Sequence, residues 1–174
     1  DCVFDGTERG LRFKTRRTRA GGGDSLYFER IRITGAKEAM RWDMLGSAFF
    51  MGELASRYPV PEVDRLTPHF RDIFIKDIIV DDTEHFIRLS GIPESPAANI
   101  VMENCDVTCE HLPQFTDVDG LTIKNSTINA QDSTILLVDA RNITFDNVTI
   151  NTEGRLTFKR EGDTTNSILF LLEE

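Results

Sequence analysis

The sequence predicts an all-β fold in which short strands wind into a solenoid of stacked coils, a parallel β-helix. Two observations lead to this prediction. Apolar residues recur at positions 1, 3, 6 and 8 of a short frame, and frames begin at residues 26, 73, 100, 121 and 143. One coil therefore takes about 21–27 residues, and the longer first interval holds either two coils or one coil with an insertion.

Five frames fit the pattern, the fourth with a serine at position 6: Leu26, Phe28, Ile31, Ile33; Ile73, Ile75, Ile78, Val80; Ile100, Met102, Cys105, Val107; Leu121, Ile123, Ser126, Ile128; Ile143, Phe145, Val148, Ile150. Positions 1 and 3 share one face of a strand, whereas position 6 has the opposite parity. The chain must therefore bend between positions 3 and 6 of every frame.

Position 5 of the frames holds Arg30, Asp77, Asn104, Asn125 and Asn147. Asparagine tolerates left-handed backbone geometry and forms local hydrogen bonds, so it suits such a bend. Stacked coils would align these side chains in a ladder, with each amide bonded to the next. We expect the asparagines of this ladder to be buried and structural.

Another short apolar strand follows each frame, over residues 39–44, 85–91, 114–120, 134–140 and 167–174. Two or three strands per coil, paired with the next coil and filled with apolar side chains, describe a parallel β-helix. A leucine-rich repeat would need dense leucine at fixed offsets, which is absent. A β-sandwich would show hairpin signals between strands, but the two Asp-Gly pairs lie near turn boundaries.

The segment Gly46–Tyr58 has apolar residues near helical spacing, and Pro59 and Pro61 would stop a helix there. We expect an inserted loop or a short helix near 46–61. Hydrophobic residues make up 40% of the chain and charged residues 28%, which fits a single globular domain over residues 1–174.

The overall charge and the apolar runs exclude two classes of partner. A formal net charge of -9 argues against general nucleic-acid binding, which favours a broad basic surface. No apolar run approaches the roughly 18 residues that a membrane helix needs. We therefore expect neither nucleic acid nor a membrane as a partner.

Cysteine and histidine show no metal-binding spacing. Cys2, Cys105 and Cys109 fit no zinc pattern, and Cys105 takes an apolar frame position, where we expect a buried thiol. The three histidines, at 69, 85 and 111, are scattered along the chain. We expect surface or turn histidines, with no metal and no cofactor.

One basic segment stands out in this acidic chain, because residues 9–19 hold six basic side chains and no acid. Strand alternation places Arg12 and Lys14 on one face, opposite Leu11 and Phe13. A forked guanidinium beside a point-like ammonium suits a carboxylate with neighbouring hydroxyls. The alternative is that both charges merely solvate the outside of a strand. Three glycines, 21–23, then allow a tight chain path, close ligand approach or a flexible loop.

The stretches CVFDGTERGLRFKT, residues 2–15, and TPHFRDIFIKDI, residues 67–78, resemble the family 28 glycoside hydrolases, the polygalacturonases. The resemblance implies a right-handed parallel β-helix and inverting hydrolysis of α-1,4 links between galacturonic acid units of pectin. It gives Arg12 and Lys14 the role of binding the substrate carboxylate beside the scissile bond. Arg17 and Arg19, in the loop that follows, are candidates for a second uronate.

The chain also departs from the family. The family's acid and base lie before the Arg–Lys motif, near a Gly-His-Gly that is absent here, and we expect Asp81-Asp82 to form only a turn. A family tyrosine is missing near Leu45, so either substrate contacts differ or Trp42 supplies an aromatic surface, although a strand tryptophan favours the core. We expect the C-terminal portion of a longer enzyme, inactive alone, with no catalytic residue of its own.

The resemblance implies a pectin hydrolase, extracellular or periplasmic, whose partners are an acidic polysaccharide and the missing N-terminal coils of the same protein. Three alternatives remain open. One is a non-catalytic carbohydrate-binding β-helix that kept Arg12 and Lys14. A structural or adhesive β-helix would bind nothing specific. A pectate lyase would need an acidic calcium cluster, which the sequence does not place.

Overall fold

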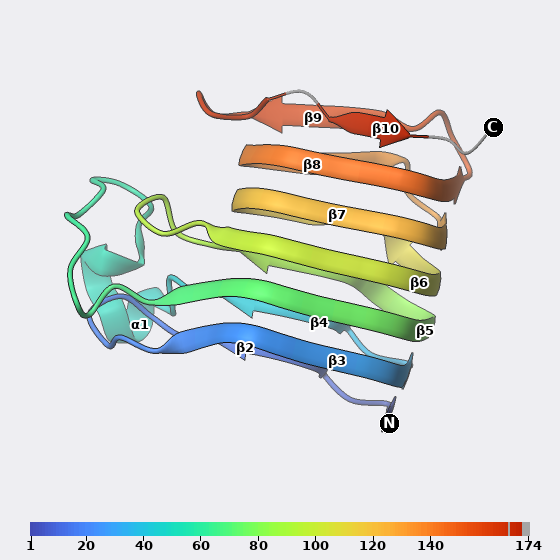
Figure 1. The fold of residues 1–174 in the computed structure, drawn as a ribbon, viewed down its shortest axis with the longest axis horizontal. Coiled ribbons are helices and arrows are strands. Elements are labelled where there is room, and N and C mark those ends of the chain that lie inside the picture. Colours follow the sequence, from blue (N-terminus) through green and yellow to red (C-terminus); the bar gives the residue numbers. More distant parts are fainter. Residues whose placement is uncertain (167, 172–174) are drawn as a thin grey trace.

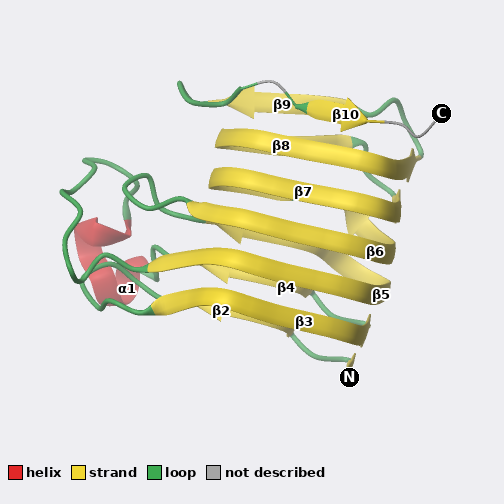
Figure 2. Ribbon diagram, in the orientation of Figure 1, coloured by secondary structure: helices red, strands yellow, loops and turns green. Residues whose placement is uncertain are grey.

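The chain forms a parallel β-helix in the computed structural model, which describes residues 1–166 and 168–171 (Figure 1). Its elements are β1 Cys2–Asp5, β2 Arg9–Lys14, β3 Gly22–Thr34, β4 Glu38–Asp43, α1 Ala48–Met51, the 3-10 helix η1 Gly52–Ala55, β5 His69–Ser90, β6 Ala97–His111, β7 Gln114–Ala130, β8 Thr134–Thr152, β9 Thr157–Glu161 and β10 Leu169–Leu171. Figure 2 shows the strands stacked as successive layers, with the helical turns at one side. All pairings between the named strands are parallel.

The strands follow two connected paths through the stack. One path runs β1-β3-β5-β6-β7-β8-β10, and the other joins β2 to β4, β4 to β5, β5 to β7 and β8 to β9. The long strands β5, β7 and β8 bend, so each one contributes to both paths. None of the described helices is long and apolar enough to span a bilayer.

The predicted frames stack position on position. Ile73 pairs in register with Leu26 on one side and with Ile100 on the other, and the same column continues to Leu121 and Ile143. These aliphatic columns fill the inside of the coils, since Ile73 is fully buried and Ile100 is 1% exposed. Because β3 pairs directly with β5, the long first interval is one coil with an insertion and not two coils.

The bends at position 5 adopt the predicted left-handed geometry, with φ between 49° and 56° in all five frames. Asn104 Nδ2 donates to Asp77 Oδ1 at 2.6 Å, and Asn147 Nδ2 donates to Asn125 Oδ1 at 2.9 Å. The ladder is therefore confirmed in two of its links, and no side-chain hydrogen bond joins Asn104 to Asn125 among the described residues. Its predicted burial is wrong, because Asn104 and Asn125 are exposed and Asn147 is only half-buried. The side chains lie on the outside of the corner.

A second ladder occupies a corner that the sequence reasoning missed. The residue immediately before each frame also has positive φ, from 51° at Asn99 to 85° at Gly120. Asn99 donates to Asp72, and Asn142 Nδ2 donates to Asp119 Oδ1 at 2.7 Å. Each coil therefore turns at two or more left-handed corners, and side chains at several of them bond to the next coil.

Several smaller predictions concern the core, and the structure bears them out. Trp42 is fully buried and stacks on Phe13 with ring centroids 4.1 Å apart, so it offers no aromatic surface. Cys105 and Cys109 are buried free thiols, and burial raises the pKa of each to about 12. By contrast, Asp81-Asp82 does not form the expected turn: it lies within the continuous strand β5, where Asp82 has a φ of 50° at a register shift.

The C-terminal strands differ from the prediction. Phe170 of β10 pairs in register with Phe145 of the last frame, so this segment forms a further frame and not the second strand of the fifth coil. The second strand is β9, where Thr157 pairs with Thr134. Residues 167 and 172–174 of the predicted strand lie outside the described residues.

The insertion, residues 46–68, leaves the coils after β4 and returns at β5, beside one end of the strands (Figure 1). It contains α1 and η1, as the sequence predicted, and continues as irregular chain. Arg57 fastens it to the stack, donating to Asp117 at 2.7 and 2.8 Å and to Asp139 at 2.5 Å. The hydrogen bonds that Arg57 donates to Asp117 raise the pKa of Arg57 above its ordinary value, despite the opposing effect of burial.

Candidate functional site

Strand β2 presents Arg12 and Lys14 on the outside of the first coils. Leu11 and Phe13 alternate with them and are 7% and 4% exposed, packed into the core. The Arg12 side chain is 38% exposed, and its nearest recorded ion pair is a long one, 3.8 Å from Nη2 to Asp43 Oδ2. The predicted placement of both cations on one strand face is therefore confirmed.

Two further arginines extend this face across neighbouring coils. Arg41 of β4 is in register with Arg12, and Arg88 of β5 is in register with Arg41. Paired strands lie about 4.8 Å apart, so the three arginine positions form a column with that repeat along the backbone. We call Arg12, Lys14, Arg41 and Arg88 the cationic face. The sequence reasoning missed Arg41 and Arg88, although the coil register would have aligned them with Arg12.

A buried carboxylate underlies the column. Glu38 is 6% exposed and accepts from Arg9 Nε at 2.6 Å and from Arg88 Nη1 at 3.2 Å, while Arg41 Nη1 lies 3.5 Å away. Burial lowers the pKa of Arg41, and repulsion from Arg88 and Arg9 adds to this against the attraction of Glu38. One carboxylate thus holds three guanidinium groups in place and leaves the face with excess positive charge.

Arg17 has a structural role in place of the substrate-binding role expected for it. It is 3% exposed, and its Nε and Nη2 donate to Glu94 at 2.5 and 2.8 Å. Its guanidinium also donates to the backbone carbonyls of Leu54, Ser56 and Arg57. These partners occupy all three of its guanidinium nitrogens. Arg17 therefore links the backbone of the insertion to Glu94, which lies between β5 and β6.

The rest of the basic loop borders a pocket of about 500 Å³. Lys14, Arg16, Arg19 and the exposed ring of Phe50 are among its lining residues. Among the described residues these three cations form no ion pair, so their charges are available to an anion. The structure therefore brings Lys14 and Arg19 to one pocket and separates both from the buried Arg17.

The glycines of the loop provide a tight chain path. Gly22 has a φ of 122°, and a Cβ there would lie 1.6 Å from the carbonyl oxygen of His69. Gly21 also has positive φ, at 77°. Glycine is therefore required where the loop passes against β5, which favours the first of the three interpretations of this stretch.

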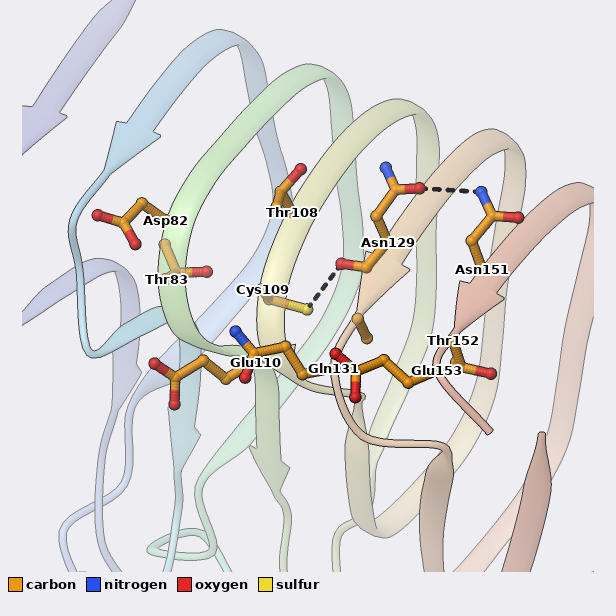
Figure 3. A pocket seen from close by; sticks show the side chains of 11 residues that line it. Asp82, Thr83, Thr108, Cys109, Glu110, Asn129, Gln131, Asn151, Thr152 and Glu153 are labelled. Atoms are coloured by element: carbon orange, nitrogen blue, oxygen red, sulfur yellow. Dashed lines mark hydrogen bonds between the residues drawn. The ribbon is translucent and has the colours of Figure 1, made fainter. Parts of the chain in front are cut away.

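A second hollow has the opposite charge. A groove of about 360 Å³ lies at a corner formed by β5, β6, β7 and β8. Asp82, Glu110 and Glu153 are among its lining residues (Figure 3). Asn151 donates to Asn129 at 2.9 Å within it. No lysine or arginine is among the residues that line the groove. It would repel a polyanion, so the cationic face is the better candidate for an acidic ligand.

Comparison of the chain with protein-family models, curated proteins and solved structures gave no match. The resemblance to family 28 glycoside hydrolases therefore rests on the quoted stretches alone. Two carboxylates lie beside the cationic face: Glu38 accepts from Arg9 and Arg88, and Asp43 lies 3.8 Å from the Arg12 guanidinium. The geometry of the described residues thus favours anion binding over acid–base chemistry.

Proposed function

We propose that this chain is the substrate-binding part of a glycoside hydrolase that acts on pectin or polygalacturonate, with inverting hydrolysis of α-1,4-galacturonosyl links. The supporting observation is the column of Arg12, Arg41 and Arg88, which repeats at the strand spacing beside Lys14. A polyuronate carries one carboxylate on every sugar. A repeating row of cations can therefore bind a polyuronate better than it binds a ligand with a single carboxylate. Guanidinium forks can grip these carboxylates through paired hydrogen bonds.

The charge distribution also favours this substrate class. A chain with net charge -9 repels a polyanion at long range, unless a local group of cations focuses the field. The cationic face and the adjoining pocket with Arg16 and Arg19 supply such a group. Because this substrate class lies outside the cell, the proposal also implies an extracellular or periplasmic parent protein.

Hydrolysis requires an acid and a base from outside the described face. Strands β1 and β2 end the two sheet paths at the N-terminal side, and Val3 there is 73% exposed. Further coils of the same protein, stacked on this edge, would carry those carboxylates. In this account the present chain binds substrate and is inactive alone.

A second candidate is a non-catalytic carbohydrate-binding β-helix. The engagement of Glu38 favours it, because this buried carboxylate accepts from both Arg9 and Arg88 and is not left to activate water. Assays of the parent protein on polygalacturonate separate the two candidates. Turnover by the parent supports the hydrolase, and tight binding without turnover supports the binding module.

The experiment that tests the shared part of both candidates is a calorimetric titration with oligogalacturonate. Replacing Arg12 and Lys14 together with alanine should weaken binding at least about tenfold, since two charge-assisted contacts are lost. The matched control replaces Lys76 and Arg155, which are exposed elsewhere. Equal affinities of the wild type and the Arg12/Lys14 variant would contradict the proposed site.

A further inference from the structure

Two histidines that lie far apart in the sequence stack on neighbouring coils. His85 of β5 and His111 of β6 are in register, with ring centroids 4.6 Å apart and an interplanar angle of 29°. One turn of the coil separates them along the sequence, so they do not form a short metal-binding motif. The fold therefore creates a pair of imidazoles that spacing alone did not reveal.

The ring of His111 is oriented by the carboxylate of Asp132. Its Nδ1 lies 3.2 Å from Asp132 Oδ2, and the other oxygen of Asp132 accepts from the Leu112 N–H at 2.8 Å. A proton held on Nδ1 by Asp132 leaves the lone pair on Nε2. This arrangement of carboxylate and histidine is the one that commonly orients metal-binding imidazoles.

The ring of His85 lies beside a third donor. Its Nε2 is 3.5 Å from Glu84 Oε1, and its Nδ1 is buried without a hydrogen-bond partner among the described residues. The His85 side chain is 15% exposed, whereas that of Glu84 is 48% exposed and free to adjust. One donor atom from each of Glu84, His85 and His111 falls within 4.8 Å of the others.

We propose that Glu84, His85 and His111 form a binding site for a divalent transition-metal ion such as Zn²⁺. Two imidazoles and one carboxylate are a donor set that Zn²⁺ accepts, with water in the fourth position. Bonds of about 2.1 Å place tetrahedral donors about 3.4 Å apart, so donors that lie up to 4.8 Å apart must approach one another by up to about 1.4 Å. The exposed Glu84 side chain can adjust, and the two stacked rings, tilted by only 29°, must also rotate so that their in-plane lone pairs meet at the ion.

A bound ion would link β5 to β6 on the outside of the stack. It would join two adjacent coils through side chains, in addition to the backbone ladder between them. Binding to the folded chain alone would raise the unfolding temperature in proportion to the logarithm of metal concentration. The inference does not depend on the proposed function, because none of the three ligands belongs to the cationic face.

The test is a titration of the metal-free chain with Zn²⁺, measured by calorimetry and by thermal unfolding. A second titration uses Co²⁺, whose visible absorption bands report the coordination geometry. We expect one equivalent to bind and the unfolding temperature to rise. His85→Ala and His111→Ala should each weaken binding at least about tenfold, and Asp132→Asn about tenfold through the orientation of His111.

His69→Ala is the matched control, since His69 is the remaining histidine and lies exposed at the start of β5. It should bind Zn²⁺ as the wild type does. Circular dichroism of each variant establishes that the coils are intact. Wild-type binding no tighter than that of the folded His85→Ala/His111→Ala chain, or an equal loss in His69→Ala, would overturn the proposal.

Discussion

The stacked coils and the insertion are held by different forces. In the coils, Ile33, Ile123 and Phe145 are fully buried and stack on equivalent residues of the neighbouring coils. In the insertion, Phe49 and Phe50 are 88% and 72% exposed. Charged contacts fasten this segment instead. Burial of apolar area therefore dominates the stability of one region, and ion pairs at a few points fix the position of the other.

The candidate site lies where these two regions meet. The coils supply Arg12 and Lys14 on a rigid strand, while Phe50 of the insertion and Arg19 of the basic loop form the adjoining pocket. The strand part of the site should persist when the insertion is loosened. The pocket should not, because one of its walls depends on the anchor at Arg17.

A pair of phenylalanine substitutions tests the difference between the regions and has the largest expected effect. Phe145→Ala should lower the free energy of unfolding by about 3–5 kcal/mol, because it leaves a cavity in a fully buried column. Phe49→Ala, at a mostly exposed ring, should change it by less than about 0.5 kcal/mol. Chemical denaturation measures both. Similar losses at the two positions would remove the distinction.

Replacing Arg17, which anchors the insertion, should cause the next largest change in the free energy of unfolding. Arg17→Met should cost about 3 kcal/mol, because the Glu94 side chain is 2% exposed and would be left as an unpaired buried charge. Limited proteolysis should then cut within residues 46–68 while the coils stay intact. The double change Arg17→Met with Glu94→Leu should recover most of the stability. An unchanged cleavage pattern would show that Arg17 does not anchor the insertion.

Each residue of the ladder corners should contribute less to the free energy of unfolding than the anchor at Arg17 does. Asn125→Ala removes the acceptor of the Asn147 amide and places alanine at a φ of 49°, so it should cost about 1–2 kcal/mol. Asn125→Gly loses the same bond but tolerates that backbone, and should cost clearly less. Denaturation curves of the two variants separate the contributions. Equal losses would mean that the left-handed geometry contributes nothing.

The reactivity of the three cysteine thiols compares buried and exposed positions of the coils without any substitution. Burial raises the pKa of Cys105 and Cys109 to about 12, so both should remain unreactive thiols in the folded coils near pH 8. The exposed Cys2 should react readily. Mass spectrometry after alkylation should show one modified cysteine in the native chain and three in denaturant. Rapid labelling of Cys109 in the native state would indicate that the coils open there.

The coils were predictable from sequence because their cause is local and repeated. Apolar positions such as Ile73 and Ile100 alternate with the strand period, and an asparagine marks a bend that only certain residues tolerate. The second corner escaped because Ser25, Asp72 and Gly120 reach the same left-handed geometry with different side chains. Varied residues at one position leave no visible pattern.

Contacts across coils were the hardest to predict. Whether a charged side chain of the basic segment is buried depends on groups far away in the sequence. Arg17, for example, is paired with Glu94. The same holds for Arg41 beside Arg12 and for His85 beside His111, which are neighbours only once the register is known. Composition and spacing identified the cationic strand but not the partners that complete or neutralise it.

The most direct test of the cationic face is the affinity of this chain for trigalacturonate compared with its fully methyl-esterified form. Esterification removes the carboxylate charges and keeps the sugar ring, so the two ligands differ in the feature that the arginine column is expected to bind. Calorimetry at low ionic strength should give at least about tenfold tighter binding of the acid form, and added salt should weaken it. Equal affinity for both forms, or no binding of the acid form, would contradict the account.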